Sequence, residues 1–450
     1  MLIESLKRRF FIQEEILFNF LRRHPAYQSI PYWISAILTG FIAVFYAKAF
    51  RWAELLSAKL IQEHPYLFLI ITPVVFLLGW MLVYFFSKPA SGSGIPQILA
   101  AGDLNTHIES KTLKSLLGIK MIFVKIFSSL LCVFAGGAIG REGPTIQVSA
   151  AVFFNVCKRF RVIWPDFNHQ SWIIAGGAAG LAAAFNTPLG GIVYAIEELC
   201  TISFHRFKVV FISSVMIAGL VAQWLLGPYL YFGFPKILPI DMRVLPYTAL
   251  IGLVTGLLGA LFGKILSIIA IKRIRIKNFW KLALFALFTG VLVSVIFVFL
   301  DPHARGSGHE SILNLLFEDE GIADWKWVIG RFFSSILSYA SGCAGGIFAP
   351  SLSIGAAIGS TFSSYLIADH NKLFVLLGMI GFLSAVTRAP FTSFVLVLEM
   401  TDRHSAIFPM MFVALISISI ARVVDKKSFY ERLHIFYSYL MAKEARFGKL

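Results

Sequence analysis

The segment AIGREGPTIQVS places an arginine and a glutamate side by side within a run of apolar residues. Arg141 and Glu142 lie between Gly140 and Gly143, and Pro144 follows. Proline suits the first turn of a helix, where its missing N–H costs nothing, so we expect a helix to begin near Glu142. The free N–H groups of a helix start attract anions. A carboxylate placed there could occupy the anion site and leave it on protonation, serving as both gate and proton carrier. The alternative is a glutamate paired with its neighbouring arginine.

Two further segments predict helix starts of the same kind. In GGIFAPSLS, Gly346 precedes the amides of Ile347, Phe348 and Ala349, and Pro350 begins a helix. In GSGIPQ, a serine hydroxyl is a further donor beside the exposed amides. No phosphate-binding lysine and no nucleotide motif accompanies these segments. Partial charges of this kind can hold a small anion without trapping it, which conduction requires.

Other ionisable residues lie within or beside apolar runs. Glu197 and Glu198 end one such run shortly before the basic segment HRFK. One of the two could deliver protons from the cytoplasmic side, or they could pair with Arg206 or Lys208. Lys125 lies mid-run and needs a partner or a polar cavity.

Composition predicts the elements that must hold these residues. Of 450 residues, 58% are hydrophobic and only 14% charged, whereas a soluble domain of this size has about a quarter charged. Apolar stretches of about 20 residues can cross the hydrocarbon core of a bilayer. The chain is therefore predicted to be an all-α polytopic membrane protein. The clearest stretches are Trp33–Ala49, Tyr66–Phe86, Leu116–Ala138, Val209–Leu226, Leu245–Ile271, Leu282–Leu300 and Ile407–Val424.

The net charge of +16 does not indicate a nucleic-acid partner. Lysine and arginine gather in short loops and in both tails, which is the positive-inside pattern of membrane topology. The segment from Asp301 to Asp324 is acidic and is predicted to be an outer loop, and both termini are predicted to face the cytoplasm. The four cysteines are isolated, so no metal site or disulfide is expected.

The chain contains an internal repeat. SGSGIPQIL resembles RGSGHESIL, GGAIGREGP aligns with GCAGGIFAP, and FNTPLGGIVYAIEE aligns with the segment around Pro390 and Glu399, in the same order. Repeats in transporters place the binding site at their interface, on Gly- and Pro-interrupted helices. The predicted division is an amphipathic cytoplasmic helix (residues 1–29), a first membrane repeat (30–225), a connecting loop (226–244), a second repeat (245–440) and a cytoplasmic tail (441–450).

Four ordered motifs resemble the CLC chloride channel and transporter family. They are GSGIP, GREGP, GGIFAP and a tyrosine just before the C-terminal tail, and the agreement spans nearly the whole chain. The resemblance implies two inverted-topology repeats of tilted and partly spanning helices. It also implies a homodimer with one pore per subunit. The chain ends soon after the tyrosine, without the cytoplasmic nucleotide-binding domains of many eukaryotic members, so a bacterial type is expected.

The resemblance also implies roles for individual residues. Glu142 matches the gating glutamate and Glu198 the internal proton-transfer glutamate, with Glu197 beside it in the proton pathway. The expected chloride ligands are the hydroxyls of Ser93 and Tyr430 and the amides of Ile347 and Phe348, with Gly346 also among the chloride-binding residues. An outer set is expected around Arg141, Gly143, Phe348 and Ala349. Gln97 stands where many relatives have a glutamate, which puts the charge balance near Lys125 in doubt.

The predicted function is exchange of chloride for protons, with Glu142 competing with chloride for the helix-start sites. Exchangers of the family usually carry an acid at the position of Glu198, and channels usually do not. A passive, gated chloride channel is the alternative, and a carrier for organic anions stays open because helix starts also bind carboxylates. No enzyme motif, cofactor or metal is expected. The expected location is the bacterial inner membrane, with chloride, protons and the lipid bilayer as partners.

Overall fold

The computed structural model describes residues 25–104, 111–160, 169–199, 208–227, 230–318, 321–366 and 370–447. Regular structure within these ranges is helical, apart from two isolated backbone bridges. Helices satisfy the backbone polar groups of their interior locally, which a bilayer core requires. Seven helices in the described ranges are long and apolar enough to cross a membrane, and they fall on the seven predicted stretches.

The first half of the chain contains nine α-helices among the described residues. They are α2 (Pro25–Glu63), α3 (Phe68–Phe86), α4 (Ile95–Asp103), α5 (Lys111–Leu117), α6 (Ile119–Phe134), α7 (Glu142–Phe160), α8 (His169–Phe185), α9 (Pro188–Tyr194) and α10 (Lys208–Leu226). A π-helical turn, Ala195–Leu199, continues α9 and carries Glu197 and Glu198.

The second half begins after a connection that contains a short 3-10 turn. Its α-helices are α11 (Leu245–Arg275), α12 (Phe279–Val295), α13 (His309–Phe317), α14 (Trp325–Ala340), α15 (Phe348–Leu366), α16 (Asn371–Thr387), α17 (Pro390–Thr401), α18 (Ile407–Val424) and α19 (Phe429–Phe447). Several of these helices are too short to span a bilayer of about 30 Å.

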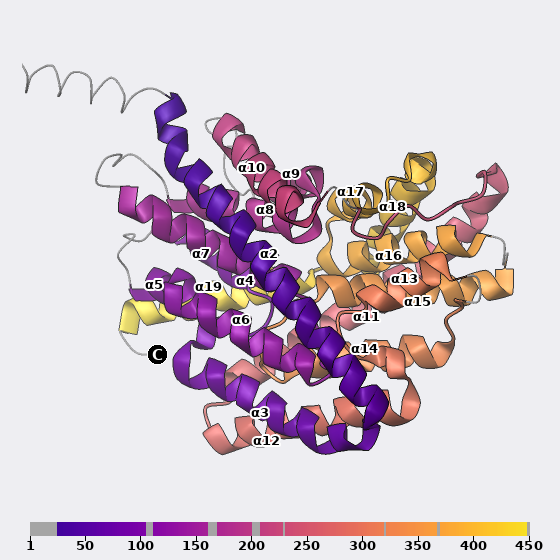
Figure 1. Ribbon diagram of the computed structural model, residues 1–450, viewed down its shortest axis with the longest axis horizontal. Coiled ribbons are helices and arrows are strands. Elements are labelled where there is room, and N and C mark those ends of the chain that lie inside the picture. Colours follow the sequence, from indigo (N-terminus) through magenta and orange to yellow (C-terminus); the bar gives the residue numbers. More distant parts are fainter. Residues whose placement is uncertain are drawn as a thin grey trace, which may run out of the picture.

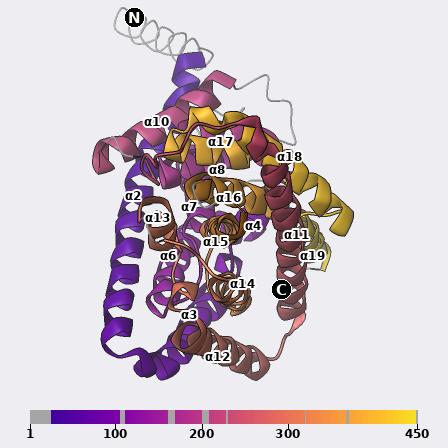
Figure 2. The ribbon, with the colours of Figure 1, turned by 90° about the vertical axis from the view of Figure 1, so that its right-hand side faces the viewer.

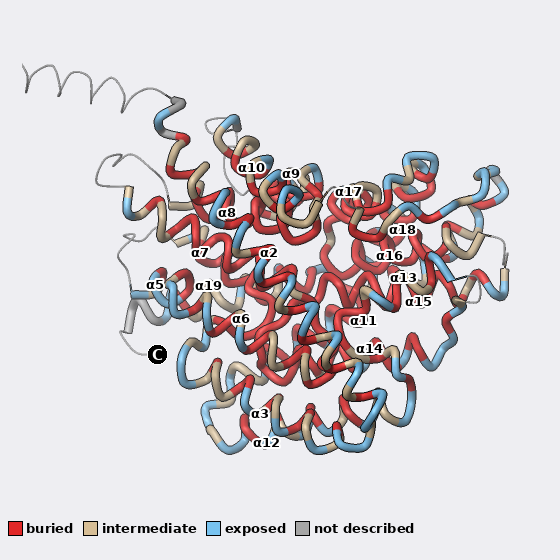
Figure 3. Tube along the Cα trace, viewed as in Figure 1, coloured by how far each residue is buried: buried red, intermediate tan, exposed pale blue. Residues whose placement is uncertain are grey.

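The two halves lie side by side, with α3 and α12 packed together along one edge (Figures 1 and 2). Buried segments fill the interior and exposed segments follow the outer helices (Figure 3). Many of the exposed residues on those outer helices are large and apolar, as with Ile70 on α3 and Leu284 on α12, each 68% exposed. An apolar exterior of this extent is that of a protein surrounded by lipid.

Two closely packed helix pairs form the interior, α7 with α8 and α15 with α16. A Cβ atom on Gly176 of α8 would lie 2.7 Å from the Ala150 Cα of α7. A Cβ on Gly355 of α15 would lie 2.2 Å from the Gly378 carbonyl oxygen of α16. Small residues therefore allow the backbones in both pairs to approach closely, as is common between helices in membranes.

Backbone conformation repeats at the spacing of the sequence repeat. Asn186 and Arg388, 202 residues apart, are left-handed with φ of 56° and 67°, and each stands two residues before a helix that begins at proline. Left-handed φ is uncommon for residues other than glycine, so its recurrence at matching positions is strong support for two equivalent halves.

Some element boundaries differ from the predicted division. The structure begins α2 at Pro25, and residues 1–24 of the predicted surface helix lie outside the described residues. The last helix, α19, continues to Phe447, well into the predicted tail. The segment from Asp301 to Asp324 was expected to be an outer loop, but this is wrong in one respect: it contains α13, because RGSGHESIL repeats the helix-starting pattern of SGSGIPQIL.

Candidate anion and proton site

The first turns of α7 and α15 meet inside the protein. Gly140, before α7, and Gly346, before α15, exchange backbone hydrogen bonds of 2.8 and 2.7 Å. Both helices then begin with two residues that have an N–H and a proline that has none. These four N–H groups lie in the first turns, where a helix offers them no internal acceptor. They belong to Glu142 and Gly143 of α7 and to Phe348 and Ala349 of α15.

Glycines allow these helix starts and the GSGIP loop to converge. A Cβ on Gly143 would lie 2.9 Å from the Ser93 Oγ, and one on Gly346 would lie 3.0 Å from the Gly143 amide nitrogen. The loop that carries Ser93 is also bonded to the segment before α15, because the Gly92 amide donates to the Cys343 carbonyl at 2.9 Å. The three segments predicted to bind an anion are therefore brought together at one place.

Glu142 places its side chain at this junction. It is 1% exposed, and neither carboxylate oxygen makes a hydrogen bond of normal geometry. A Cβ on Gly140 would lie 2.2 Å from one carboxylate oxygen, and the Ala349 amide is close enough to interact with the carboxylate. The carboxylate thus lies against the start of α15, on the opposite repeat.

A cavity of about 310 Å³ leads to Glu142. It is lined by residues of the α2 and α13 regions as well as α7, and both signs of charge are present. The charged residues in its lining are Lys48, Arg51, Glu54, Arg141, Glu142 and Glu310. Arg51 and Glu310 form an ion pair of 2.8 Å across it, between α2 and α13. Glu142 therefore borders a polar space lined by charges of both signs.

Ser93 and Tyr430 also lie near the junction. Both are fully buried, and Tyr430 is close enough to interact with Ser93. The Tyr430 hydroxyl makes no hydrogen bond of normal geometry, and its ring stacks on Phe348 with centroids 6.1 Å apart. Two hydroxyl donors from opposite ends of the chain thus come together next to the start of α15.

Lys125 finds its partner in the backbone. Its Nζ donates to the Gly92 carbonyl at 2.8 Å, so the buried ammonium group fixes the loop that carries Ser93. Gln97 does not contact Lys125 in any recorded hydrogen bond. Its amide nitrogen donates instead to the Ser91 carbonyl at 2.9 Å. An ionised glutamate has no proton to donate to this carbonyl, whereas a glutamine has. The glutamine at position 97 therefore suits its surroundings in this protein.

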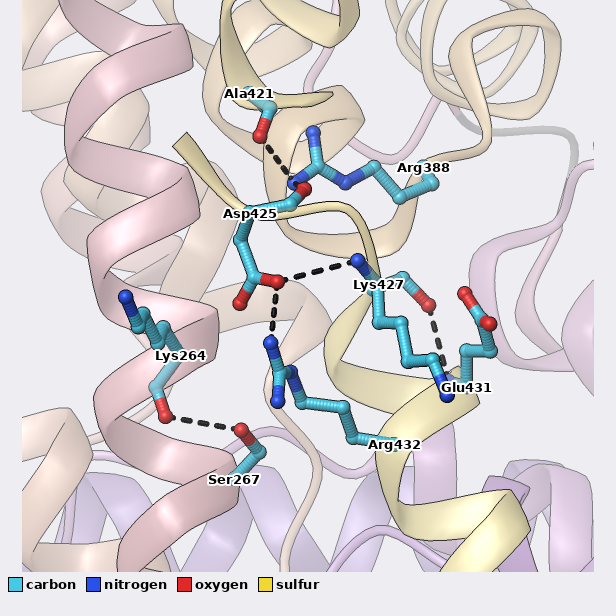
Figure 4. A network of polar contacts seen from close by, with 9 residues as sticks. Lys264, Ser267, Arg388, Ala421, Asp425, Lys427, Glu431 and Arg432 are labelled. Atoms are coloured by element: carbon cyan, nitrogen blue, oxygen red, sulfur yellow. Dashed lines mark hydrogen bonds and ion pairs between the residues drawn. The ribbon is translucent and has the colours of Figure 1, made fainter. Parts of the chain in front are cut away.

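A polar network lies at the turn between α18 and α19 (Figure 4), and Tyr430 follows in the first turn of α19. Arg388 donates to the Asp425 carbonyl at 2.8 Å and to the Ala421 carbonyl at 2.6 Å, which closes the end of α18. The Asp425 carboxylate accepts from the Lys427 amide at 3.1 Å and forms an ion pair with Arg432 of α19. The first residues of α19, including Tyr430, are thereby tied to α18.

A family model for the voltage gated chloride channel matches residues 74–422. The chain belongs to the voltage gated chloride channel family. The matched range contains both helix starts, the GSGIP loop and the two glutamates of the π-helical turn. Tyr430 lies just beyond it.

Curated relatives in the voltage gated chloride channel family match most of the chain. The H(+)/Cl(-) exchange transporter ClcA of Vibrio vulnificus is 30% identical over 383 residues, covering 81% of this chain and 78% of the relative. The protein of the same name from Citrobacter koseri is 29% identical over 416 residues, covering 88% and 85%.

Solved structures show that the chain has the fold of this family. A slow cyanobacterial Cl-/H+ antiporter superposes with a TM-score of 0.78 at 23% identity, covering 91% of this chain and 97% of that one. A CLC-type fluoride/proton antiporter superposes with a TM-score of 0.74 at 20% identity, covering 90% and 97%.

The two glutamates that follow α9 in this family member have different surroundings. Glu197 accepts hydrogen bonds from the amides of Phe391 at 3.2 Å and Thr392 at 2.7 Å, and from the Thr392 hydroxyl at 2.7 Å. It therefore caps the start of α17, in the other repeat. Glu198 makes no hydrogen bond to any described residue that the structure records, and it is close enough to Tyr194, Tyr430 and Glu431 for electrostatic interaction. Arg206 and Lys208, considered as partners from the sequence, lie in a part whose side chains are not described.

The described residues contain no group of three or more His, Cys, Asp or Glu side chains that could hold a metal ion. Cys132, Cys157 and Cys343 are buried free thiols, and Cys200 lies outside the described residues.

Proposed function

We propose that this protein is a secondary transporter that exchanges chloride for protons across a membrane. The observation that carries the proposal is the buried, unpartnered carboxylate of Glu142 at the joined starts of α7 and α15. An anion at that point is attracted by the exposed amides and the dipoles of two helices. The names of the curated relatives, H(+)/Cl(-) exchange transporters, support the same reaction.

In the proposed mechanism, chloride and the Glu142 carboxylate compete for the same amides. Chloride occupies a central site formed by the hydroxyls of Ser93 and Tyr430 with the amides of Ile347 and Phe348. An outer site uses the amides around Arg141, Gly143, Phe348 and Ala349. The Gly346 amide, expected from the sequence to be a ligand, is not one of these donors because it donates to the Gly140 carbonyl. When Glu142 is protonated, it loses its attraction to the amides and turns into the cavity, and chloride takes its place.

Glu198 is proposed to carry protons between Glu142 and the inner solution. Its carboxylate is near Tyr430, and no recorded hydrogen bond commits it to a structural role. Glu197 is proposed to support this site from beside it, since its own oxygens are bonded to the start of α17. The cavity at Glu142 then opens outward, and both termini lie in the cytoplasm of a bacterial cell whose inner membrane holds the protein.

The protein is proposed to act as a homodimer with one pore in each subunit. Leu189 on α9 and Phe391 on α17 are 60% and 54% exposed. Their amides lie at helix starts and donate hydrogen bonds to the carboxylates of Glu399 and Glu197. Such polar helix ends are unfavourable next to lipid, and a second copy would cover them. Light scattering of the protein in nanodiscs should give two copies, and Ile196→Trp on the same exposed face should give one.

Liposomes that contain the purified protein provide the test of exchange. A chloride gradient is applied without a pH gradient, and the external pH is recorded. An exchanger moves protons uphill, driven by chloride, and Glu142→Ala abolishes that movement. Rapid chloride flux without proton movement would instead establish a passive channel.

A further inference from the structure

The loop before α13 has the same structure as the loop before α4. Gly92 and Gly94 have φ of 65° and 96°, and Gly306 and Gly308, 214 residues later, have φ of 63° and 89°. In the first copy the Ile95 amide donates to the Ser93 Oγ at 3.3 Å. In the second the His309 amide donates to the Ser307 Oγ, also at 3.3 Å. Ser307 is thus the counterpart of Ser93.

A buried cation holds each copy in the same way. Lys125 donates to the Gly92 carbonyl at 2.8 Å, and Arg331 donates to the Gly306 carbonyl at 2.8 Å. Both cations are fully buried, and they stand in the related sequences VKIFSS and GRFFSS. The scaffold that presents Ser93 to an anion is therefore reproduced around Ser307.

A carboxylate already occupies the second copy. Glu54, from α2, accepts hydrogen bonds from the Ser307 amide at 2.5 Å and from the Ser307 hydroxyl at 2.9 Å with one oxygen. A Cβ on Gly306 would lie 2.5 Å from the same oxygen. An anionic group thus lies on the donors that correspond to those of Ser93.

The surroundings of Ser307 suit a free anion. Ser307 and Glu54 line the cavity of about 310 Å³ that reaches Glu142, whose buried, unpartnered carboxylate lines the same space. The basic residues of its lining, Lys48, Arg51 and Arg141, are matched by Glu54, Glu142 and Glu310, so loss of the Glu54 carboxylate makes the cavity more positive. The cavity is large enough for a halide ion, and it leaves room beside Ser307 for one if the Glu54 side chain were absent.

We propose that Ser307 and the start of α13 form a second binding site for a halide-sized anion, which the Glu54 carboxylate keeps closed. The proposal rests on the proposed function in one respect, because it takes Ser93 as an anion ligand. The second site lies in the cavity that leads to the gate, away from the central site. Removing the carboxylate opens it to chloride or bromide from the solution.

Bromide anomalous scattering from crystals of the full-length protein tests this proposal. Bromide is soaked into the wild type, Glu54→Ala, Glu54→Gln and Glu310→Ala. Glu310→Ala is the matched control, because it removes another carboxylate from the same cavity and leaves the Ser307 donors capped. Glu54→Gln retains the size of the side chain and guards against misfolding of the alanine variant.

The expected result is a gain of one bromide peak beside Ser307 in the two Glu54 variants, and none there in the wild type or Glu310→Ala. Adding Ser307→Ala to Glu54→Ala should remove the new peak. Absence of the peak from both Glu54 variants overturns the proposal, as does its appearance in Glu310→Ala. The peak at Ser93 and Tyr430 is a separate readout. Its absence from all four proteins, with the Ser307 peak present in the Glu54 variants, would count against the proposed function and leave the second site at Ser307 supported.

Discussion

Glu142 and Glu197 are both carboxylates at helix starts, and the hydrogen bonds around them separate their roles. Glu197 accepts three hydrogen bonds from the start of α17, whereas Glu142 accepts none of normal geometry. A carboxylate that is bonded on both oxygens is fixed, and one that is only attracted by nearby amides can move. At this scale, the absence of a hydrogen bond of normal geometry to the Glu142 carboxylate supports its proposed role as the gate.

Glu142→Gln should leave chloride flux in place and reduce coupled proton flux to background. Glutamine is close to the shape of the protonated side chain but cannot carry a proton. The measurement is proton uptake against a chloride gradient in liposomes, with chloride efflux recorded from the same preparation. Undiminished coupling would remove Glu142 from the proton pathway.

Glu198→Gln should abolish proton movement and retain chloride flux, because Glu198 is the proposed carrier on the inner side. The matched control is Glu197→Gln, at the neighbouring position, which should keep coupling. Both are measured as the ratio of proton to chloride flux. If the control lost coupling and Glu198→Gln kept it, the two assignments would have to be exchanged.

Some residues of this site could be predicted from the sequence, and the partners of others could not. Arg141, Glu142 and Ser93 stand in short Gly- and Pro-rich motifs, whose local physics already implies a helix start. The partner of Lys125 could not be predicted, because it is a backbone carbonyl and no sequence pattern marks it. The contact between Glu54 and Ser307 could not be predicted either, because the two residues are 253 positions apart and no sequence motif links them.

Helix starts and the loop before α4, rather than the seven long apolar helices, position the candidate site. The apolar stretches predict those seven helices well, but the proposed ligands lie in the GSGIP loop, near the starts of α7 and α15, and on α19. Their positions depend on contacts between distant segments, such as the bridge between Gly140 and Gly346. Hydropathy does not predict such contacts. In the sequence, the repeated Gly- and Pro-rich motifs indicated that these segments meet at the interface between the repeats.

The turn between α18 and α19 should control how firmly Tyr430 is held. Asp425→Ala removes the acceptor of Arg432 and of the Lys427 amide, which should cost about 1 to 3 kcal/mol of stability. We expect chloride affinity to fall several-fold by calorimetry, because the start of α19 becomes less ordered. Lys427→Ala is the control, since its exposed side chain takes no part in the recorded contacts and only its backbone does. Equal affinities in both variants would show that this network does not act on Tyr430.

At the scale of the whole molecule, each half caps a helix of the other half with a glutamate. Glu197 of the first half caps α17, and Glu399 of the second half, 202 residues later, caps α9 through the amides of Leu189 at 3.1 Å and Gly190 at 2.8 Å. The sequence alignment paired these two glutamates but could not show that each bonds to the opposite half. Halves related by a pseudo-two-fold axis can make an equivalent contact twice, as these two caps do.

Glu197→Gln and Glu399→Gln should therefore destabilise the protein by similar amounts, roughly 1 to 2 kcal/mol each, through loss of a charge at a partly buried helix start. The double variant should lose less than the two together, because both caps fix the same pair of helices, α9 and α17, and sites that share partners are not additive. Unfolding in detergent micelles, followed by circular dichroism, measures all three. Glu431→Gln is the control, because this exposed glutamate caps no helix of the opposite half through its side chain in the recorded contacts. A large loss of unfolding free energy for one variant and none for the other would contradict this prediction. It would mean that the two caps share a geometry but that only one of them stabilises the contact between the halves.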